Sequence, residues 1–273
     1  MAGSTLSRRR FRPLRPLVLL ACASLGALAA LAGLPGAAAG QVDVQPLSRD
    51  ELPEGYSGSL TTNLTAQTGN TDFVQLGVNA RVYNVVGRRT TMIVGNGGLG
   101  FLGRSRFSSS GLFHYRRTYR LSAWAWPEWY AQANYDRAQL LVWRTVVGAG
   151  ARTPVTTGPW GEAGAGFSLL VEDERLDLEP EAVHPDHTLA VRGSAHFSLR
   201  LVPGQVVITS TTYAQPRVDD PGDIRLLQEM SVASPVTDRL ALTVSFDLRY
   251  DSGPPDGLAP VDARLRTGLT LSY

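Results

Sequence analysis

The C-terminal part of the chain carries the clearest alternation of apolar and polar side chains. From residue 240 to residue 250 every second side chain is apolar, and those between are small, polar or charged. The same two-residue period returns from residue 261 to Tyr273. Strands of soluble proteins usually run for about five or six residues, whereas a membrane-spanning β-strand needs about nine to eleven, with one apolar face. The pattern therefore predicts two strands of a transmembrane β-barrel.

Ten earlier stretches share this period, which brings the predicted number of strands to about twelve. They are residues 56–66, 72–84, 90–102, 112–121, a stretch that ends near residue 135, 140–152, 161–173, 187–201, 205–214 and 223–234. In the sixth stretch, for example, Leu141, Trp143 and Val147 fall on the predicted lipid face and Arg144 on the opposite face.

Glycines and aromatic residues gather where a narrow barrel would use them. The third stretch is rich in glycine, which would be costly in an isolated strand but leaves room for large side chains across a lumen. Dense aromatics follow the fourth stretch and suit the interfacial girdle of a membrane protein, a soluble hydrophobic core being the alternative for this segment. They are Trp124, Trp126, Trp129 and Tyr130.

The predicted connections form two alternating sets of different length. The short set comprises residues 85–89, 123–127, 153–159, 202–204 and 235–238. The longer set, richer in Pro, Asp and Glu, includes residues 103–111, 174–186, 215–222 and 251–260. Outer-membrane barrels have short periplasmic turns, longer outside loops and an even number of strands. We therefore expect an all-β, closed antiparallel transmembrane barrel, with ten or fourteen strands as the alternative counts.

Residues 1–40 have the layout of a secretory signal peptide. Five arginines precede an apolar run over residues 17–34, and small residues follow at 37–40. Cleavage is expected after Ala39 or Gly40, so residues 41–55 would form a periplasmic lead-in and residues 56–273 the barrel. An uncleaved anchor is the alternative. A twin-arginine export signal fits less well, because membrane barrels are exported unfolded. A lipoprotein site at Cys22 also fits less well, because more of the apolar leader follows this cysteine.

Composition excludes several classes of function. The chain has no lysine, so its 26 basic residues are all arginine, and its formal net charge is +2. Removing the five arginines of residues 1–40, where there is no acid, leaves 26 − 5 = 21 arginines against 24 acids, or −3. No basic surface for nucleic acid remains. The single cysteine, Cys22, lies in the leader, so we expect no disulfide and no thiolate metal site in the mature chain.

Ionisable residues in the inward phase of the predicted strands form a first candidate site. This lumen-lining set is Arg81, Glu128, Arg144, Glu162, Arg192, His196, Arg225, Glu229, Asp247, Arg249, Arg264 and Arg266. An arginine-rich lining would favour anions in a narrow pore. The same residues could instead form a paired network that fills the barrel, because a charge that faces a small lumen needs a partner.

Turn residues at the predicted outer rim form a second candidate site. Closure of the barrel brings the first and last strands together, and with them Asn70, Asp72, Asp136 and Asp251. An acidic rim could bind a cation or a sugar. The simpler interpretation is that Asn, Asp, Gly and Pro are the residues that such turns need.

No motif indicates catalysis. An outer-membrane lipid hydrolase needs a His within reach of a Ser on the lipid face, but His114 and His196 share the inward phase, and His184 and His187 lie in or beside the longest loop. No Gly-x-Ser-x-Gly elbow, His-Glu-x-x-His helix or phosphate loop is present. We therefore expect no enzyme activity, no cofactor and no metal, with His184 and His187 as polar loop residues.

Three motifs resemble those of a known family. They are residues 69–72 after the first strand, residues 134–137 followed by Arg144 and residues 148–150, and residues 251–255 before the last strand. In this order they resemble the salt-induced outer-membrane proteins, a bacterial β-barrel domain of unknown function, although this chain has Gly253 where that family has an arginine. The resemblance implies an outer-membrane barrel and brings no established activity or catalytic residue.

Together these patterns predict a porin-like barrel of the Gram-negative outer membrane. It would act as a narrow pore or, by the resemblance, as an envelope component made under salt or osmotic stress. Its expected partners are outer-membrane lipid, small solutes or ions, and the barrel-assembly machinery, which would recognise the C-terminal strand ending at Tyr273. The alternatives are a barrel that binds ligands through its outside loops, a lipid hydrolase, and a secreted soluble barrel or sandwich.

Overall fold

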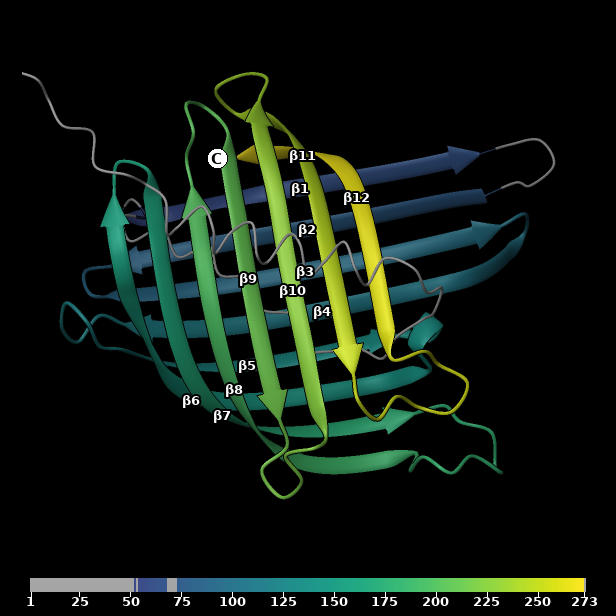
Figure 1. The fold of residues 1–273 in the computed structure, drawn as a ribbon. Helices are drawn as coiled ribbons and strands as arrows, with labels where there is room; N and C mark the ends of the chain where they lie inside the picture. The colour runs from purple at the N-terminus through teal and green to yellow at the C-terminus, as the bar shows by residue number, and fades with distance from the viewer. Residues whose placement is uncertain (1–51, 53, 68–72, 273) are drawn as a thin grey trace, which may run out of the picture. The chain divides into compact units, whose positions relative to one another are not determined.

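A computed structural model describes residues 52, 54–67 and 73–272. Within these residues twelve strands close into a barrel, in which β12 pairs with β1 (Figure 1). The strands are β1 (Gly55–Gln67), β2 (Phe73–Val86), β3 (Arg89–Leu102), β4 (Ser105–Tyr119), β5 (Trp126–Asp136), β6 (Leu141–Gly158), β7 (Gly161–Leu176), β8 (His187–Leu201), β9 (Val207–Pro216), β10 (Ile224–Pro235), β11 (Leu240–Asp251) and β12 (Val261–Ser272). A 3-10 helix, η1 (Arg137–Gln139), joins β5 to β6. No helix in this part of the chain is long and apolar enough to cross a membrane.

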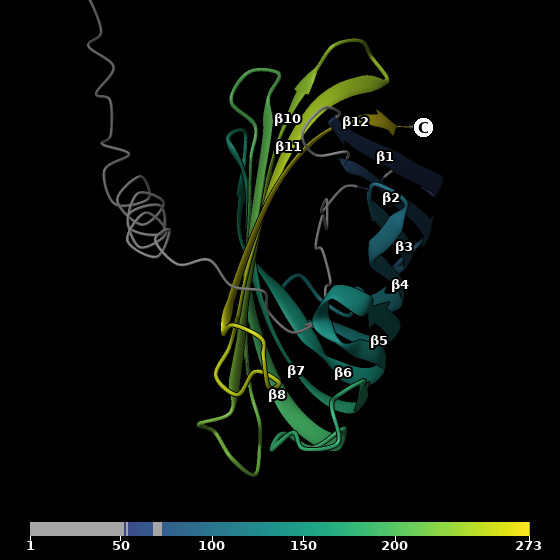
Figure 2. The same cartoon turned by 90° about the vertical axis from the view of Figure 1, so that its right-hand side faces the viewer.

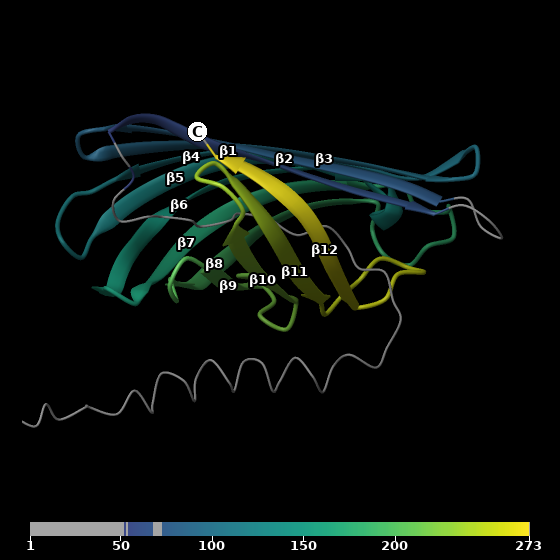
Figure 3. The same cartoon turned by 90° about the horizontal axis from the view of Figure 1, so that it is seen from above.

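All neighbouring strands run antiparallel. Strands β1–β4 lie on one wall of the barrel and β9–β12 on the facing wall (Figures 2 and 3). Strands of the two walls cross steeply in projection (Figure 1), because strands must tilt to close a barrel. The predicted closed antiparallel barrel of about twelve strands is confirmed.

The two faces of each strand differ as the alternation predicts. On β8, Leu189 is 66% exposed and Val191 is 44% exposed, whereas Arg192 is 2% exposed. On β12, Leu265 is exposed, while Arg266 lines an internal cavity. An apolar outer wall around an ionisable interior is the arrangement of a membrane barrel and the reverse of a soluble core.

An apolar layer also crosses the interior. It consists of Tyr83, Met92, Val94, Tyr130, Val146, Leu170, Tyr213 and Leu227, all buried. Leu52, which precedes β1, packs against this layer. Glu54 accepts a hydrogen bond of 2.8 Å from the Gly87 N–H in the turn between β2 and β3. The start of β1 is therefore held both to the interior layer and to a neighbouring turn.

The prediction of a loop at residues 103–111 is wrong. Residues 103–104 form a tight turn, with Gly103 at φ 59°, and β4 already begins at Ser105. The first residues of β4 do not alternate, because Arg106 and Phe107 are both exposed and three serines follow them, and pairing with β3 orders them instead. Strands β6 and β7 likewise extend to Gly158 and Leu176, beyond their predicted ends.

A β-bulge moves Leu141 to the inside of the barrel. This residue was expected on the lipid face, but it is 2% exposed, because the pairing of β6 with β7 shifts register between Leu141 and Trp143. The aromatic segment also divides. Trp124 and Trp129 are exposed, as a girdle requires, whereas Trp126 and Tyr130 are buried.

Among the described residues, the pairing of β1 with β12, called the seam below, is the shortest in the barrel. It joins residues 59–62 of β1 to residues 269–272 of β12, at four positions. The pairing of β1 with β2 extends over thirteen positions. Figure 1 shows that the C-terminal end of β12 meets β1 and that the rest of β12 diverges from β1. The barrel is therefore closed by a short segment of backbone pairing.

Candidate functional site

One side of the lumen, lined by β6, β7, β8, β10 and β11, holds an ion network. The network consists of Arg144, Glu172, Glu174, Arg192, Asp223, Arg225 and Asp251. Strand register creates two of its contacts directly, because Arg144 lies opposite Glu174 and Arg225 lies opposite Asp251. Charged side chains of opposite sign on adjacent strands thus face each other inside the barrel.

Glu172 is the centre of this network. Its carboxylate lies 2.7 Å from Arg192 Nε, 3.0 Å from Arg225 Nη1 and 3.9 Å from Arg144 Nε. Arg144 also pairs with Glu174. Glu172 is 1% exposed, Arg144 0% and Arg192 2%. Charges buried this completely depend on one another, because removing one partner leaves another uncompensated.

A second cluster surrounds Glu128 on β5. Its Oε2 accepts a hydrogen bond of 2.9 Å from Arg152 Nε and lies 3.5 Å from Arg116 Nη1. The Arg116 guanidinium stands over the Tyr130 ring at 5.2 Å. The hydroxyl groups of Tyr130 and Ser168 share a hydrogen bond of 2.9 Å. This cluster, the ion network and the apolar layer together fill one part of the lumen, called the filled side below.

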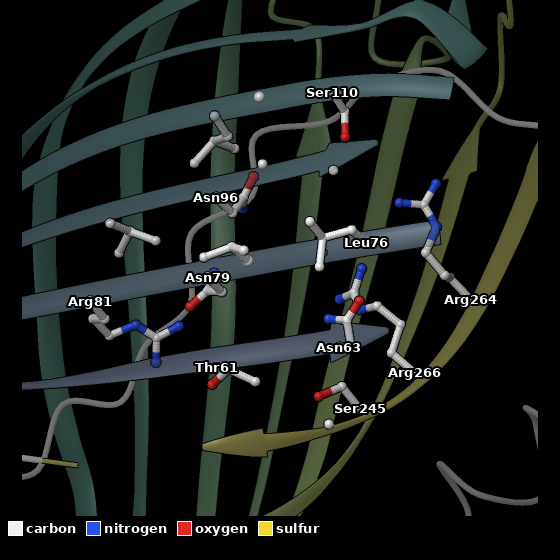
Figure 4. A pocket seen from close by; sticks show the side chains of 18 of the residues that line it. Thr61, Asn63, Leu76, Asn79, Arg81, Asn96, Ser110, Ser245, Arg264 and Arg266 are labelled. Atoms are coloured by element: carbon white, nitrogen blue, oxygen red, sulfur yellow. The ribbon is translucent and has the colours of Figure 1, made fainter. Parts of the chain in front are cut away.

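The other side of the lumen keeps a cavity of about 260 Å³, called the chamber below. It is lined by β1–β5 and β10–β12. Many of its side chains carry hydroxyl or amide groups, among them Thr61, Asn63, Asn79, Asn96, Ser110 and Ser245 (Figure 4). Glycines provide the space, because an added Cβ would crowd Asn63 at Gly77 and would lie 3.0 Å from Ser110 Oγ at Gly98.

The chamber carries an excess of positive charge. Its charged lining residues are Arg81, Asp136, Arg249, Arg264 and Arg266, which gives 4 − 1 = +3. Asp247 pairs with Arg266 from just outside the lining. Asp262 lies 3.5 Å from Arg264. Counting both carboxylates leaves 3 − 2 = +1, and Glu229, which lies opposite Asp247 outside the lining, balances that charge. The positive excess thus belongs to the residues of the lining itself, which offer a small anion guanidinium, hydroxyl and amide hydrogen-bond partners.

The structure divides the predicted lumen-lining residues between the two sides. On the filled side lie Glu128, Arg144, Arg192 and Arg225, and at the chamber or its edge lie Arg81, Asp247, Arg249, Arg264 and Arg266. Three further residues complete the set. Glu229 is buried opposite Asp247. Glu162 is half-buried opposite Arg200, and the His196 ring packs on Tyr213 at 5.5 Å.

Of the predicted rim residues, Asn70 and Asp72 lie outside the described part of the chain, as does Tyr273. Asp251 is 1% exposed, pairs with Arg225 Nε at 2.8 Å and accepts a hydrogen bond from the Gly253 N–H. Asp136 is also buried, and it accepts a hydrogen bond of 3.1 Å from the Ala138 N–H at the start of η1. Both carboxylates therefore serve interior contacts.

Several members of the two clusters were not expected from the sequence. They are Arg116, Arg152, Glu172, Glu174 and Asp223. The predicted loop at residues 174–186 would include Glu174, but β7 continues to Leu176. The inward phase of Glu172, combined with Arg144 on the preceding strand, is the signal that could have identified it.

The loops at the β7–β8 end of the barrel hold their polar residues locally. The His184 N–H donates to Asp256 Oδ2 at 2.8 Å, which joins the β7–β8 and β11–β12 loops. His187 Nε2 lies 2.7 Å from Asp173 Oδ1. In the β9–β10 loop, the hydrogen bond from Arg217 lowers the pKa of the exposed Asp219 carboxyl. His184 and His187 therefore make polar contacts in or beside these loops.

Solved structures of similar fold are outer-membrane barrels. The COG4313 outer membrane channel from Pseudomonas putida F1 shares 10% identity, with 85% of this chain and 100% of that chain covered and a TM-score of 0.50. The translocator domain of autotransporter NalP from Neisseria meningitidis shares 10% identity over 82% and 90%, with a TM-score of 0.45. The NanC porin shares 6% identity over 80% and 100%, with a TM-score of 0.47. At such identities the likeness concerns the fold alone.

A comparison with curated proteins gave no match. A family described as "Protein of unknown function, DUF481" matches residues 63–273. The matched segment begins within β1 and includes β2 through β12. Because it covers more than half of the chain, the protein belongs to the DUF481 family.

Proposed function

We propose that this protein is an integral barrel of the Gram-negative outer membrane that acts as a narrow, mostly closed channel for small anionic solutes and has no catalytic role. The observation that carries the proposal is the charge of the chamber, where four arginines stand with one carboxylate in the lining. Charged side chains that line a pore select ions of the opposite sign. A guanidinium also gives planar, paired hydrogen bonds to carboxylate or phosphate oxygens.

The filled side supports the closed character of the proposed channel. Arg144, Leu170 and Arg192 are each 2% exposed or less, so side chains shield that part of the lumen from solvent. A solute in the chamber would need some of these side chains to move before it could pass. We therefore expect brief openings of small conductance and no large permanent pore.

The outer wall and the C-terminal strand indicate the partners of the barrel. The exposed leucines and valines of the outer wall would contact outer-membrane lipid, and the barrel-assembly machinery would take the C-terminal strand. Nucleic acid is not among the partners. On the resemblance given above, we infer that synthesis rises under salt stress. Immunoblots of outer-membrane fractions from cells grown at low and high salt would test this, and equal amounts would remove the stress role.

The channel is tested by currents across planar bilayers that contain the purified barrel. In a potassium chloride gradient, the reversal potential should show a preference for chloride over potassium. The double variant Arg264→Gln/Arg266→Gln removes two chamber charges while keeping hydrogen-bonding side chains, so the preference should fall. Arg175→Gln is the matched control, because Arg175 is an exposed arginine on β7.

Chloride preference that survives in the double variant would contradict the role of these two arginines. The absence of any current from wild type, at all voltages, would contradict the channel itself and favour a barrel that only binds its solute. Equal loss of preference in Arg175→Gln would assign the selectivity to overall charge and not to the chamber.

A further inference from the structure

The seam leaves part of the barrel wall without strand pairing. Among the described residues, β1 beyond residue 62 and β12 before residue 269 are not paired with each other, although each keeps its other neighbour. A Cβ on Gly268 would lie 2.5 Å from the Thr62 carbonyl oxygen, so the two backbones still touch there. Beyond this contact the strands diverge, as Figures 1 and 3 both show.

The chamber reaches this unpaired stretch. Its lining includes Asn63 from β1 and Arg264, Arg266 and Gly268 from β12. Figure 4 shows Asn63, Arg264 and Arg266 around the cavity. The two strand edges that fail to pair are therefore also two borders of the positively charged cavity.

The outer face of the same stretch is apolar. Leu64 on β1 is 68% exposed and Leu265 on β12 is 69% exposed. Because side chains alternate along each strand, these leucines point outward beside inward-facing Asn63 and Arg264. On each strand, adjacent residues therefore face opposite surfaces: one faces the apolar outer wall and the next faces the polar, positively charged chamber.

Unpaired strand edges are costly in hydrocarbon, since backbone N–H and C=O groups find no water there. A polar group placed between the two edges would remove that cost. The positive charge of the chamber selects an anionic group for this position, and the flanking leucines suit acyl chains. We propose that the unpaired part of the seam is a lateral entry through which an anionic amphiphile inserts its head group into the chamber while its chains stay in the bilayer.

The size of the chamber agrees with a head group. Sites for drug-sized ligands occupy about 300–1,000 Å³, and the chamber, at about 260 Å³, lies just below that range. A phosphate or carboxylate with a few hydroxyl groups would meet Arg264, Arg266 and the amide side chains. This inference rests on the proposed function, because it names the ligand class of the same chamber.

A reversible clasp across the seam tests the entry route. If pairing continued past residue 62, Leu64 would face Thr267, because Thr62 pairs with Leu269. The variant Leu64→Cys/Thr267→Cys places two thiols on the outer face there, and the chain's single native cysteine, Cys22, precedes the described residues. A bismaleimide joins the same thiols if they are too far apart for a disulfide. The control Leu60→Cys/Leu271→Cys clasps a position that is already paired.

Binding is read by native mass spectrometry in a non-ionic detergent, with dihexanoyl phosphatidylglycerol as the probe. Dihexanoyl phosphatidylcholine tests the need for net negative charge, and glycerol phosphate tests the need for acyl chains. We expect saturable binding of phosphatidylglycerol that weakens about tenfold, or about 1.4 kcal/mol, when the Leu64/Thr267 pair is joined. Reduction of the disulfide should restore it, and the Leu60/Leu271 clasp should leave it unchanged.

Unchanged phosphatidylglycerol binding in the joined Leu64/Thr267 variant would overturn the lateral entry. So would equal binding of glycerol phosphate, which would assign the chamber to soluble anions and leave the proposed channel intact. A dimer whose formation the clasp abolishes would also overturn it, because a second copy would then cover the edges. If wild type showed no chloride preference but still bound the lipid, the proposed channel alone would be contradicted and the lateral entry would stand.

Discussion

The filled side and the chamber are two parts of one barrel with opposite contents. Inward positions of β6–β8 include arginines, glutamates and leucines beside glycines and serines, whereas those of β1–β3 carry mainly glycine, serine, threonine and asparagine and no carboxylate. The ion network holds three arginines and four carboxylates, while the chamber lining is net positive. Strand number fixes the width of a barrel, so the size and charge of the inward side chains decide which part is closed and which accepts a ligand.

The largest expected effect is on the filled side. Glu172→Ala removes the carboxylate that contacts Arg144, Arg192 and Arg225, so each of these buried arginines loses one of its carboxylate partners. We expect the free energy of unfolding to fall by about 3–5 kcal/mol, as when one partner of a buried pair is removed. Urea unfolding of the refolded barrel in lipid vesicles, followed by tryptophan fluorescence, measures this.

The exposed pair in the β9–β10 loop provides the control. Asp219 is 65% exposed in its side chain and pairs with Arg217, so Asp219→Ala should leave the unfolding midpoint unchanged because water screens such pairs. Equal effects of the two substitutions would contradict the distinction between a buried network and a solvated surface pair.

The sequence predicted the barrel better than it predicted the contents of the lumen. Alternation marked β8 and β12 because each has one face toward lipid. It failed at the start of β4, where Arg106 and Phe107 are both exposed and serines follow, and at Leu141, where a bulge changes the phase. These are local backbone features that no two-residue period can record.

Pairing between side chains was harder to predict than their direction. Alternation predicts an inward phase for Arg144 and Arg225, and both are buried, but which carboxylates meet them depends on strand register and on the true end of β7. Glu172 has three arginine neighbours because the adjacent strands β6 and β8 supply Arg144 and Arg192 and the non-adjacent strand β10 supplies Arg225. The chamber likewise depends on how glycines of β2 and β3 come together, which alternation alone does not determine.

An intermediate effect is expected on the chamber side. Gly98→Leu adds a side chain at an inward position where a Cβ lies 3.0 Å from Ser110 Oγ. We expect it to reduce chloride current by occupying the cavity and to lower stability by about 1–3 kcal/mol through overpacking. Bilayer recordings and urea unfolding give the two quantities.

Gly97→Leu is its matched neighbour. The alternation of β3 points this position outward, and a Cβ there meets only the Ser110 carbonyl oxygen at 3.9 Å. Current should stay at the wild-type value. If Gly97→Leu reduced the current as much as Gly98→Leu, the loss would come from altered strands and not from a filled chamber.

The smallest effect is expected at the seam. The Thr270 hydroxyl shares hydrogen bonds of 2.8 Å with both Thr61 and Thr243, so Thr270→Val should lower the free energy of unfolding by about 1 kcal/mol. Thr267→Val, on the exposed face of β12, should change it by less. A larger loss of unfolding free energy in Thr267→Val than in Thr270→Val would show that the inward hydroxyl groups do not stabilise the seam.

Chemical access to the two sides tests the central comparison most directly. Ser245→Cys places a thiol in the chamber and Ser168→Cys places one on the filled side, where Ser168 is 5% exposed. Each is treated with anionic and cationic methanethiosulfonate reagents, and each rate is divided by that reagent's rate with free cysteine. We predict that Ser245→Cys reacts, faster with the anionic reagent, and that Ser168→Cys does not react. Equal reaction at both positions, or a cationic preference at Ser245→Cys, would contradict the account.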